Sequence, residues 1–293
     1  MTSSKRNILP PLRSDAWLFH VPAVVSTAAA CILVLIVLFM LREAWPVLQR
    51  VGFLRFLSDP AWHPAEGLYG LAPMLAASLA IAAGAVLLAG PFGVASALFV
   101  RFYAAAPIAS AFRLALLLLA GLPSVVLGLW GLTVLVPLIG GIEPPGASLI
   151  AGVLVLALMI LPTIALTTEA ALNAMPESYL RGAAALGLSR ESTILGVILP
   201  AVKGSIMAGI LLSAARALGE TVVLLMVTGN VVQLPASLFD PVRALTANIA
   251  LEMAYAMGDH RAALFVSGLM VAIMVLFFVL VSRRLGGGWS FNV

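Results

Sequence analysis

Six stretches of apolar residues alternate with polar segments along the 293-residue chain. Each stretch contains about 20 or more residues with few charges, the length that a helix needs to cross the hydrocarbon core of a bilayer. The six predicted membrane-spanning helices cover residues 21–41, 71–98, 112–139, 148–167, 204–228 and 262–282. The third stretch is too long for a straight span and contains Pro123 and Pro137, so we expect it to kink or break.

The segments between the spans predict a single membrane domain over residues 21–282, with tails at 1–20 and 283–293. The long connections are two external segments, 42–70 and 229–261, and a cytoplasmic segment, 168–203. In the second external segment, Asp240 followed by Pro241 is typical of a helix N-terminus. We therefore expect a short helix that starts there and lies across the mouth of the bundle.

Basic residues orient the spans. With both termini in the cytoplasm, the cytoplasmic segments hold ten basic residues, namely Lys5, Arg6, Arg13, Arg101, Arg113, Arg181, Arg190, Lys203, Arg283 and Arg284. The external segments hold five, namely Arg42, Arg50, Arg55, Arg243 and Arg261. Because lysine and arginine are retained on the cytoplasmic side, this ratio predicts cytoplasmic termini. Four tryptophans lie close to the predicted span ends, where we expect them to act as interfacial anchors: Trp17, Trp45, Trp62 and Trp289.

Composition supports a membrane protein and excludes several other classes. The chain is 62% hydrophobic and 10% charged, whereas about 25% of the residues of a soluble domain are charged. The mean hydropathy is +1.14. A single cysteine, Cys31, excludes an intramolecular disulfide and a cysteine-based metal site. We assign the net charge of +4 to cytoplasmic loops rather than to nucleic-acid binding.

No pattern in the chain predicts catalysis. A phosphate-binding Walker loop requires glycines before a lysine, and neither Lys5 nor Lys203 has that context. The histidines His20, His63 and His260 are scattered, and no serine lies in a G-x-S-x-G turn. We therefore expect no enzyme activity, no cofactor and no metal site in this chain.

Two charges interrupt the fifth predicted span, in the stretch ARALGETVVLLMVTGN at 215–230. Each charge costs roughly 2.5–3.5 kcal/mol at the centre of a membrane helix, so Arg216 and Glu220 need a reason. On one continuous helix the two residues would share a face. Arg216 suits a tetrahedral oxyanion, and Glu220 would neutralise it when the path is empty. The alternative is a structural ion pair that holds the fifth helix to a neighbour.

Hydroxyl and amide groups near these charges are weaker candidates for the same path. Thr221, Thr228 and Asn230 follow Glu220, and Ser124 lies beside the expected kink at Pro123. Such residues more often hydrogen-bond to the backbone of their own helix.

The cytoplasmic connection contains the pattern of a helix, a glycine turn and a second helix. Pro176 starts the first helix, Gly187 forms the turn, Ser189 caps the second helix and Pro200 closes it. Such a projection suits docking into the groove of another subunit, and the alternative is an ordinary amphipathic surface hairpin.

Taken together, these stretches resemble the PstC-type permeases of phosphate ABC importers. The resemblance rests on FLSDPAWHPAEGLYGLAPMLAASL (56–79), LAGLPSVVLGLWGLTVLVPLI (119–139), ARALGETVVLLMVTGN (215–230), LFDPVRALTANIALEMAYA (238–256) and the cytoplasmic motif of importer permeases. That motif fits only when it is anchored on Gly187, so its E-A-A slot falls on Arg181, Gly182 and Ala183. The letters E-A-A at 169–171 are out of frame. Arg181 in place of the usual glutamate leaves the contact of that acid in question.

The resemblance implies an all-α type I ABC importer permease fold of about six spans in a bacterial inner membrane. It also implies a PstA-like permease partner, two ATP-binding cassette subunits, a periplasmic phosphate-binding protein and phosphate as cargo. In the family, the residues matching Arg216 and Glu220 belong to the translocation path. The ATPase-coupling residues would be Pro176, Arg181, Gly182, Ala183, Gly187, Ser189, Leu199 and Pro200.

Three other functions remain open at the level of sequence. The cargo would be another oxyanion, such as molybdate, sulfate or phosphonate, in a related importer. A proton-coupled secondary transporter would use Glu220 as its proton carrier. A scaffold that does not transport would tolerate replacement of Arg216.

Overall fold

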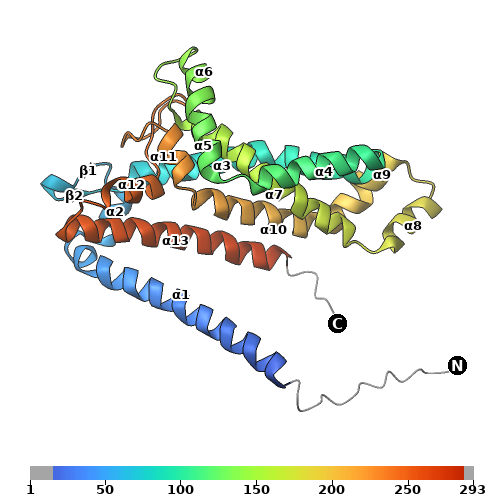
Figure 1. Ribbon diagram of the computed structural model, residues 1–293, viewed down its shortest axis with the longest axis horizontal. Coiled ribbons are helices and arrows are strands. Elements are labelled where there is room, and N and C mark those ends of the chain that lie inside the picture. The colour runs from blue at the N-terminus through green and yellow to red at the C-terminus, as the bar shows by residue number, and fades with distance from the viewer. Residues whose placement is uncertain (1–15, 287–293) are drawn as a thin grey trace.

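The computed structural model describes residues 16–286, and helices form most of them (Figure 1). Five helices are long and apolar enough to cross a membrane, within 20–51, 72–103, 149–173, 190–218 and 258–285. A sixth span consists of two helices that meet at an angle of 93°. The sequence prediction of about six spans in an all-α membrane protein is therefore confirmed.

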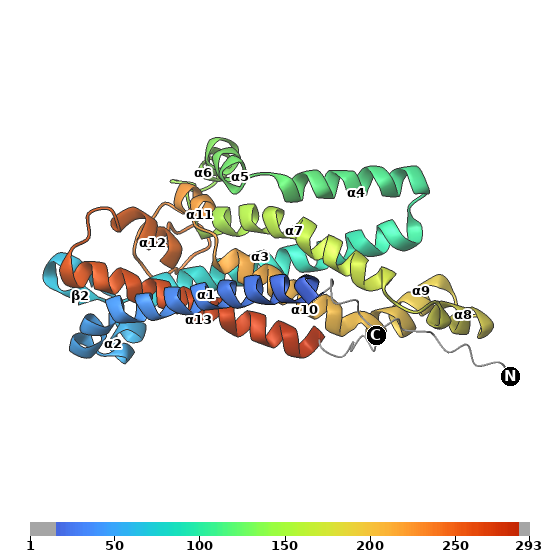
Figure 2. The ribbon, with the colours of Figure 1, turned by 60° about the horizontal axis from the view of Figure 1, so that its bottom comes forward.

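The long helices form a bundle with short elements at both ends. They are α1 (Ala16–Val51), α3 (Ala72–Leu98), α4 (Ala106–Gly121), α7 (Leu149–Asn173), α10 (Leu199–Leu218) and α13 (Gly258–Gly286). One end, here called the α12 end, carries α2 (Phe53–Ser58), the hairpin β1 (Trp62–His63) and β2 (Leu68–Tyr69), and α12 (Leu245–Glu252). The opposite end, the α8 end, carries α8 (Glu177–Ala185) and α9 (Arg190–Thr193) (Figure 2).

The core surrounds α7, which packs against α3 on one side and α10 on another. Leu156, Ile160 and Ile164 of α7 are fully buried. Glycines allow the close approach to α3, because a Cβ on Gly84 would lie 2.8 Å from Val153. By contrast, α1 diverges from the bundle, and the large apolar side chains from Val21 to Phe39 are exposed, as suits contact with lipid.

The third span breaks at the first of its two prolines. α4 ends at Gly121, and Pro123 precedes α5 (Ser124–Trp130), which continues through a π-helical turn (Gly131–Leu135) into α6 (Val136–Gly140). The break expected near Pro123 is confirmed. Pro137 causes no break because it lies in the first turn of α6, directly after the π-helical turn. α6 projects away from the bundle axis (Figure 1).

The fifth span differs from the prediction at both ends. Helix runs without a large bend from Arg190, so the expectation that Pro200 closes a helix is wrong. A π-helical turn (Ile194–Ile198) precedes Pro200, which therefore enters the first turn of α10 without breaking the run. At the other end α10 stops at Leu218, and α11 (Val222–Val227) starts after a break of three residues.

The second external segment does not begin its helix at Asp240. The carboxylate of Asp240 accepts hydrogen bonds from the backbone amides of Ala236 and Ser237, each at 2.8 Å, so it caps the preceding loop instead. Val242 then forms an isolated bridge with Gly229, and α12 starts only at Leu245. Gly229 has φ +83°, and a Cβ there would lie 2.8 Å from Pro241, so the bridge requires glycine.

The cytoplasmic connection has the local structure expected from its sequence. α8 starts directly after Pro176, and Gly187 forms the turn with φ +65°. The Ser189 hydroxyl accepts a hydrogen bond from the amide of Ser192 at 3.2 Å and so caps α9. The helix, turn and helix pattern is confirmed.

Candidate functional site

Arg216 is exposed and lies in the last turn of α10. Its Nη1 donates a hydrogen bond to the hydroxyl oxygen of Thr163 on α7, at 3.2 Å. Thr163 lies about 21 Å from the start of α7 and about 15 Å from its end, at 1.5 Å per residue. The guanidinium therefore lies beside the middle third of α7.

Glu220 does not share a helical face with Arg216, because α10 has already ended at Leu218. The sequence inference from a continuous helix is therefore wrong. Glu220 lies in the three-residue break before α11, and its amide donates to the carbonyl of Ala217 at 3.2 Å. No ion pair links the two residues within the described part of the chain. The charge of Arg216 thus has no carboxylate partner among residues 16–286.

The neighbouring polar residues mostly bond to their own backbone. Thr228 donates to the carbonyl of Leu224 at 2.7 Å, and the Asn230 amide group donates to that of Leu225 at 2.7 Å. Thr221 donates to Gly219 at the longer distance of 3.4 Å. The hydrogen bonds of Thr228 and Asn230 to the backbone therefore give no support for these two residues as donors to a cargo in the path.

Ser124 starts α5, which packs along α11. A Cβ on Gly128 would lie 3.2 Å from the Cα of Val223, and one on Gly131 would lie 2.9 Å from Val227. Because the two helices run in the same direction, Ser124 lies at about the level of the break at Gly219. The breaks in the third and fifth spans therefore occur at a similar depth.

A second polar cluster, which the sequence did not predict, lies at the α12 end around Glu252. This carboxylate is 8% exposed and accepts hydrogen bonds from Trp62 Nε1 at 3.0 Å and Arg243 Nη1 at 2.7 Å. The Nε2 of His260 lies 2.8 Å from Oε2, the oxygen that also accepts from Trp62, whereas Arg243 donates to Oε1. We call Trp62, Arg243, Glu252 and His260 the Glu252 cluster. Trp62 is 6% exposed, so it is a buried hydrogen-bond donor, and the expectation of an interfacial anchor is wrong for it.

The cluster continues into buried amide and phenol groups. Arg243 also donates to Asn248 Oδ1 at 3.1 Å and to the Asn230 carbonyl at 2.9 Å. Burial raises the pKa of Tyr69, and the carboxylate of Asp259 adds to this shift, so the phenol beside Trp62 stays neutral. The network ties the β1–β2 hairpin, α12 and the start of α13 together.

A third polar contact joins α4 to α7. The Arg113 guanidinium forms an ion pair with Glu169, whose side chain is 8% exposed, and Arg113 Nε lies 3.0 Å from Glu169 Oε1. The sequence predicts Arg113 in a cytoplasmic segment, but α4 starts at Ala106, so Arg113 lies within that helix. Glu169, the first letter of the out-of-frame E-A-A, is therefore a buried structural acid.

The residues of the cytoplasmic motif lie at the α8 end. Ala183 is buried, whereas Arg181 and Gly182 are exposed, and Arg181 lies 3.8 Å from Glu177 of the same helix. Leu199 and Pro200 lie in the first turn of α10. The exposed face of this end also carries Tyr179 and Leu186, the latter 78% exposed.

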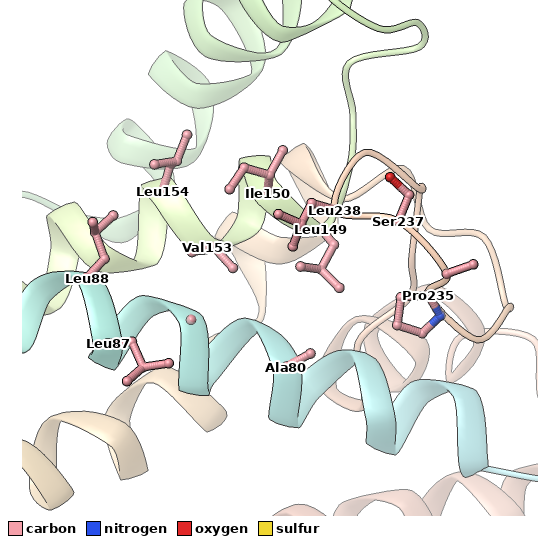
Figure 3. A pocket seen from close by; sticks show the side chains of 12 residues that line it. Ala80, Leu87, Leu88, Leu149, Ile150, Val153, Leu154, Pro235, Ser237 and Leu238 are labelled. Carbon is pink, nitrogen blue, oxygen red and sulfur yellow. The ribbon is translucent and has the colours of Figure 1, made fainter.

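One cavity is apolar, and its lining does not include Arg216. About 680 Å³ in volume, it lies between α3, α7 and the loop at 235–238 (Figure 3). Leu87, Leu154 and Leu238 contribute to its wall, and Ser237 is its only polar side chain. Such a wall does not suit an oxyanion. Among the described residues, no group of histidine, cysteine and acidic side chains has the arrangement of a metal site.

Comparison with known proteins places the chain among transport permeases. Residues 89–287 match the family described as binding-protein-dependent transport system inner membrane component. The probable ABC transporter permease protein YqgH of Bacillus subtilis is 36% identical over 82% of this chain and 79% of its own length. The phosphate transport system permease protein PstC of Mesorhizobium japonicum is 30% identical over 88% of this chain and 87% of its own length.

Two solved structures of ABC transporters have the same fold. An inward-facing form of the MetNI methionine ABC transporter matches with a TM-score of 0.59 and 17% identity, over 78% of this chain and 99% of that chain. An amino acid ABC transporter matches with a TM-score of 0.55 and 18% identity, over 72% of this chain and 90% of that chain. The chain thus belongs to the inner-membrane components of binding-protein-dependent transport systems and, within them, to the PstC-type permease family.

Proposed function

We propose that this permease subunit forms half of the translocation path of an ATP-driven phosphate importer. The observation that carries the proposal is Arg216, a cation beside the middle third of α7 that is exposed and has no carboxylate partner among the described residues. A bare arginine in a bilayer is costly, so it needs an anion or a water-filled path. Its planar donors suit two oxygens of a tetrahedral phosphate at once. Phosphate is the cargo in the name of the PstC relatives.

Glu220, Thr221 and Ser124 complete the proposed path around the two helix breaks. Interrupted helices at mid-membrane are a common way to build a transport site, since free backbone groups then face the cargo. Glu220 repels phosphate and so weakens its binding next to Arg216, which favours release. Thr221 and Ser124 offer hydroxyl donors at the same level.

The exposed position of Arg216 favours a path that closes only when a second permease covers this face. We propose a PstA-like subunit as that partner. Two ATP-binding cassette subunits would bind the α8 end, and a periplasmic phosphate-binding protein would deliver cargo at the α12 end. No nucleic acid is involved.

ATPase docking would use the coupling residues of the α8 end, which are Pro176, Arg181, Gly182, Ala183, Gly187, Ser189, Leu199 and Pro200. The exposed Tyr179 and Leu186 on the same face support an interface there, because large apolar side chains outside the membrane favour contact with protein. With the α8 end in the cytoplasm, both termini are cytoplasmic and the segments 42–70 and 229–261 are external.

The test is uptake of [32P]phosphate by cells that lack their own high-affinity system and express this chain with its neighbouring subunits. Arg216→Gln should lower uptake about tenfold or more, the loss expected for a hydrogen bond to a charged group. Arg42→Gln is the matched control, since Arg42 is exposed on α1 and forms no ion pair within residues 16–286. Both variants must reach the membrane in equal amounts.

Three results would contradict parts of the proposal. Uptake unchanged by Arg216→Gln would remove Arg216 from the path. Uptake of molybdate, sulfate or phosphonate instead of phosphate by the unmodified complex would replace the cargo. Collapse of uptake by a proton ionophore, with ATP held constant, would indicate a secondary transporter.

A further inference from the structure

The break in the fifth span is hydrogen-bonded to α12, an element of the external segment. The hydroxyl of Thr246 donates to the backbone carbonyl of Glu220 at 2.7 Å. That carbonyl lies outside both α10 and α11, and Thr246 is the only donor to it among the described residues. Thr246 is 9% exposed, so water competes little for the bond.

The first turn of α12 is also fixed to α3. The backbone amide of Leu245 donates to the hydroxyl of Ser78 at 3.0 Å, and both groups are buried. An amide in the first turn of a helix has no partner within that helix, so Ser78 supplies the bond that the helix lacks. Thr246 and Ser78 together hold this end of α12 between two spans.

The last turn of α12 ends in the Glu252 cluster. Trp62, Arg243 and His260 hold the carboxylate of Glu252 from three other segments of the α12 end. An eight-residue helix is about 12 Å long. One short helix therefore connects the buried Glu252 cluster with the break beside Arg216.

We infer that α12 couples the α12 end of the protein to the fifth-span break, with Thr246 as the positioning residue. A shift of the Glu252 cluster moves α12 as a body, because short helices transmit displacement along their axis. Its first turn then strains or releases the Glu220 carbonyl, and the backbone after Arg216 changes with it. The inference rests on the proposed function, in which a partner docks at this end and Arg216 lines the path.

The experiment measures how accessible the break is, without reference to cargo. Cys31 is the single cysteine, so Cys31→Ser gives a background free of thiols. Gly219→Cys introduces the reporter, because Gly219 is exposed and the nearest atom to a Cβ there is the Arg216 carbonyl oxygen at 3.6 Å. A membrane-impermeant maleimide is applied from the α12 side to the assembled complex in vesicles.

Thr246→Val removes the donor and keeps the branched shape, whereas Thr246→Ser keeps the donor. Labelling of the reporter should rise about two- to tenfold in Thr246→Val, the range that one buried hydrogen bond supports, and stay at the parental rate in Thr246→Ser. Thr27→Val is the matched control, because Thr27 donates only to its own helix, at the carbonyl of Ala23.

Parental labelling in Thr246→Val would overturn the inference. Should that variant fail to assemble, Ser78→Ala removes the neighbouring anchor of α12 and should raise labelling in the same direction, and a parental rate there overturns the inference equally. The labelling assay tests the role of α12, and the phosphate-uptake assay tests the proposed function, so the two can be rejected independently. Loss of uptake in Arg216→Gln with no labelling change in Thr246→Val keeps the proposed function and rejects the role of α12. The reverse pattern rejects the path and keeps the coupling.

Discussion

Replacement of Glu252 by glutamine tests whether the Glu252 cluster holds the α12 end together. The substitution keeps the size of the side chain and one carbonyl oxygen. It removes the charge and turns one acceptor into an amide donor, which must then face Arg243 on one side or Trp62 and His260 on the other. At least one buried donor therefore loses its partner.

The loss is large because the cluster is buried. The side chains of Glu252, Arg243 and His260 are 10%, 19% and 17% exposed, so solvent screens the ion pair weakly. A hydrogen bond to a charged group contributes about 1.5–3 kcal/mol, and a buried donor without a partner costs about 1–3 kcal/mol. Since the two contributions are not additive, we expect Glu252→Gln to lower the free energy of unfolding by about 2–4 kcal/mol.

The assay is the apparent Tm of the complex in detergent, read from loss of the monodisperse gel-filtration peak after heating. For a chain of this size the loss corresponds to roughly 4–10 °C. Glu66→Gln is the matched control. Glu66 lies at the same end and is exposed, and its side chain forms no hydrogen bond within residues 16–286. In a double-mutant cycle with Trp62→Phe, the two changes should couple. A Tm for Glu252→Gln that equals that of Glu66→Gln would refute the reasoning.

Two further changes test the packing of α7. Glu169→Gln should lower the free energy of unfolding by about 1–3 kcal/mol, and we expect the lower end of this range because the Arg113 side chain is 45% exposed. The control is Glu177→Gln on the exposed α8, which should lower the free energy of unfolding by less. Both effects are read from the apparent Tm. Gly209→Ala should lower the free energy of unfolding by about 1–2 kcal/mol, because the new Cβ would lie 2.6 Å from the hydroxyl of Thr167 on α7. The control is Gly90→Ala, which should be neutral or stabilising because no atom lies within 4 Å of its Cβ. Equal Tm values for the two alanine variants would contradict this packing.

The elements that sequence predicts well are those set by local chemistry. Apolar length alone identifies the spans, because no shorter or more polar helix crosses a bilayer. The turn at Gly187 and the cap at Ser189 follow from residues within four positions of each other. The break at Pro123 agrees with the hydrogen bond that proline cannot make, but proline alone does not decide it, because α3 and α7 continue through Pro91 and Pro162.

The parts that sequence does not predict depend on contacts between distant residues. Trp62 and Glu252 are 190 positions apart, and Arg113 and Glu169 are 56 apart. Periodicity along the chain carries no information about such pairs. From sequence alone, Trp62 therefore has the context of an interfacial anchor, and Glu169 that of an E-A-A motif out of frame. The start of α12 shows the same limit. Asp240 and Pro241 satisfy a local helix rule, yet the bridge between Val242 and Gly229 fixes that backbone as extended.

The partners of three arginines, Arg113, Arg216 and Arg243, distinguish the structural charges from the proposed functional one. Arg113 and Arg243 each have a buried, hydrogen-bonded carboxylate as partner, Glu169 and Glu252 respectively. Arg216 has only a threonine hydroxyl, although a carboxylate follows it four residues later. A helix continued past Leu218 would have brought Glu220 onto the face of Arg216 and made the structural pair possible. Because the helix ends before Glu220, Arg216 has no carboxylate partner among the described residues, and this favours an anion from outside the chain as its partner.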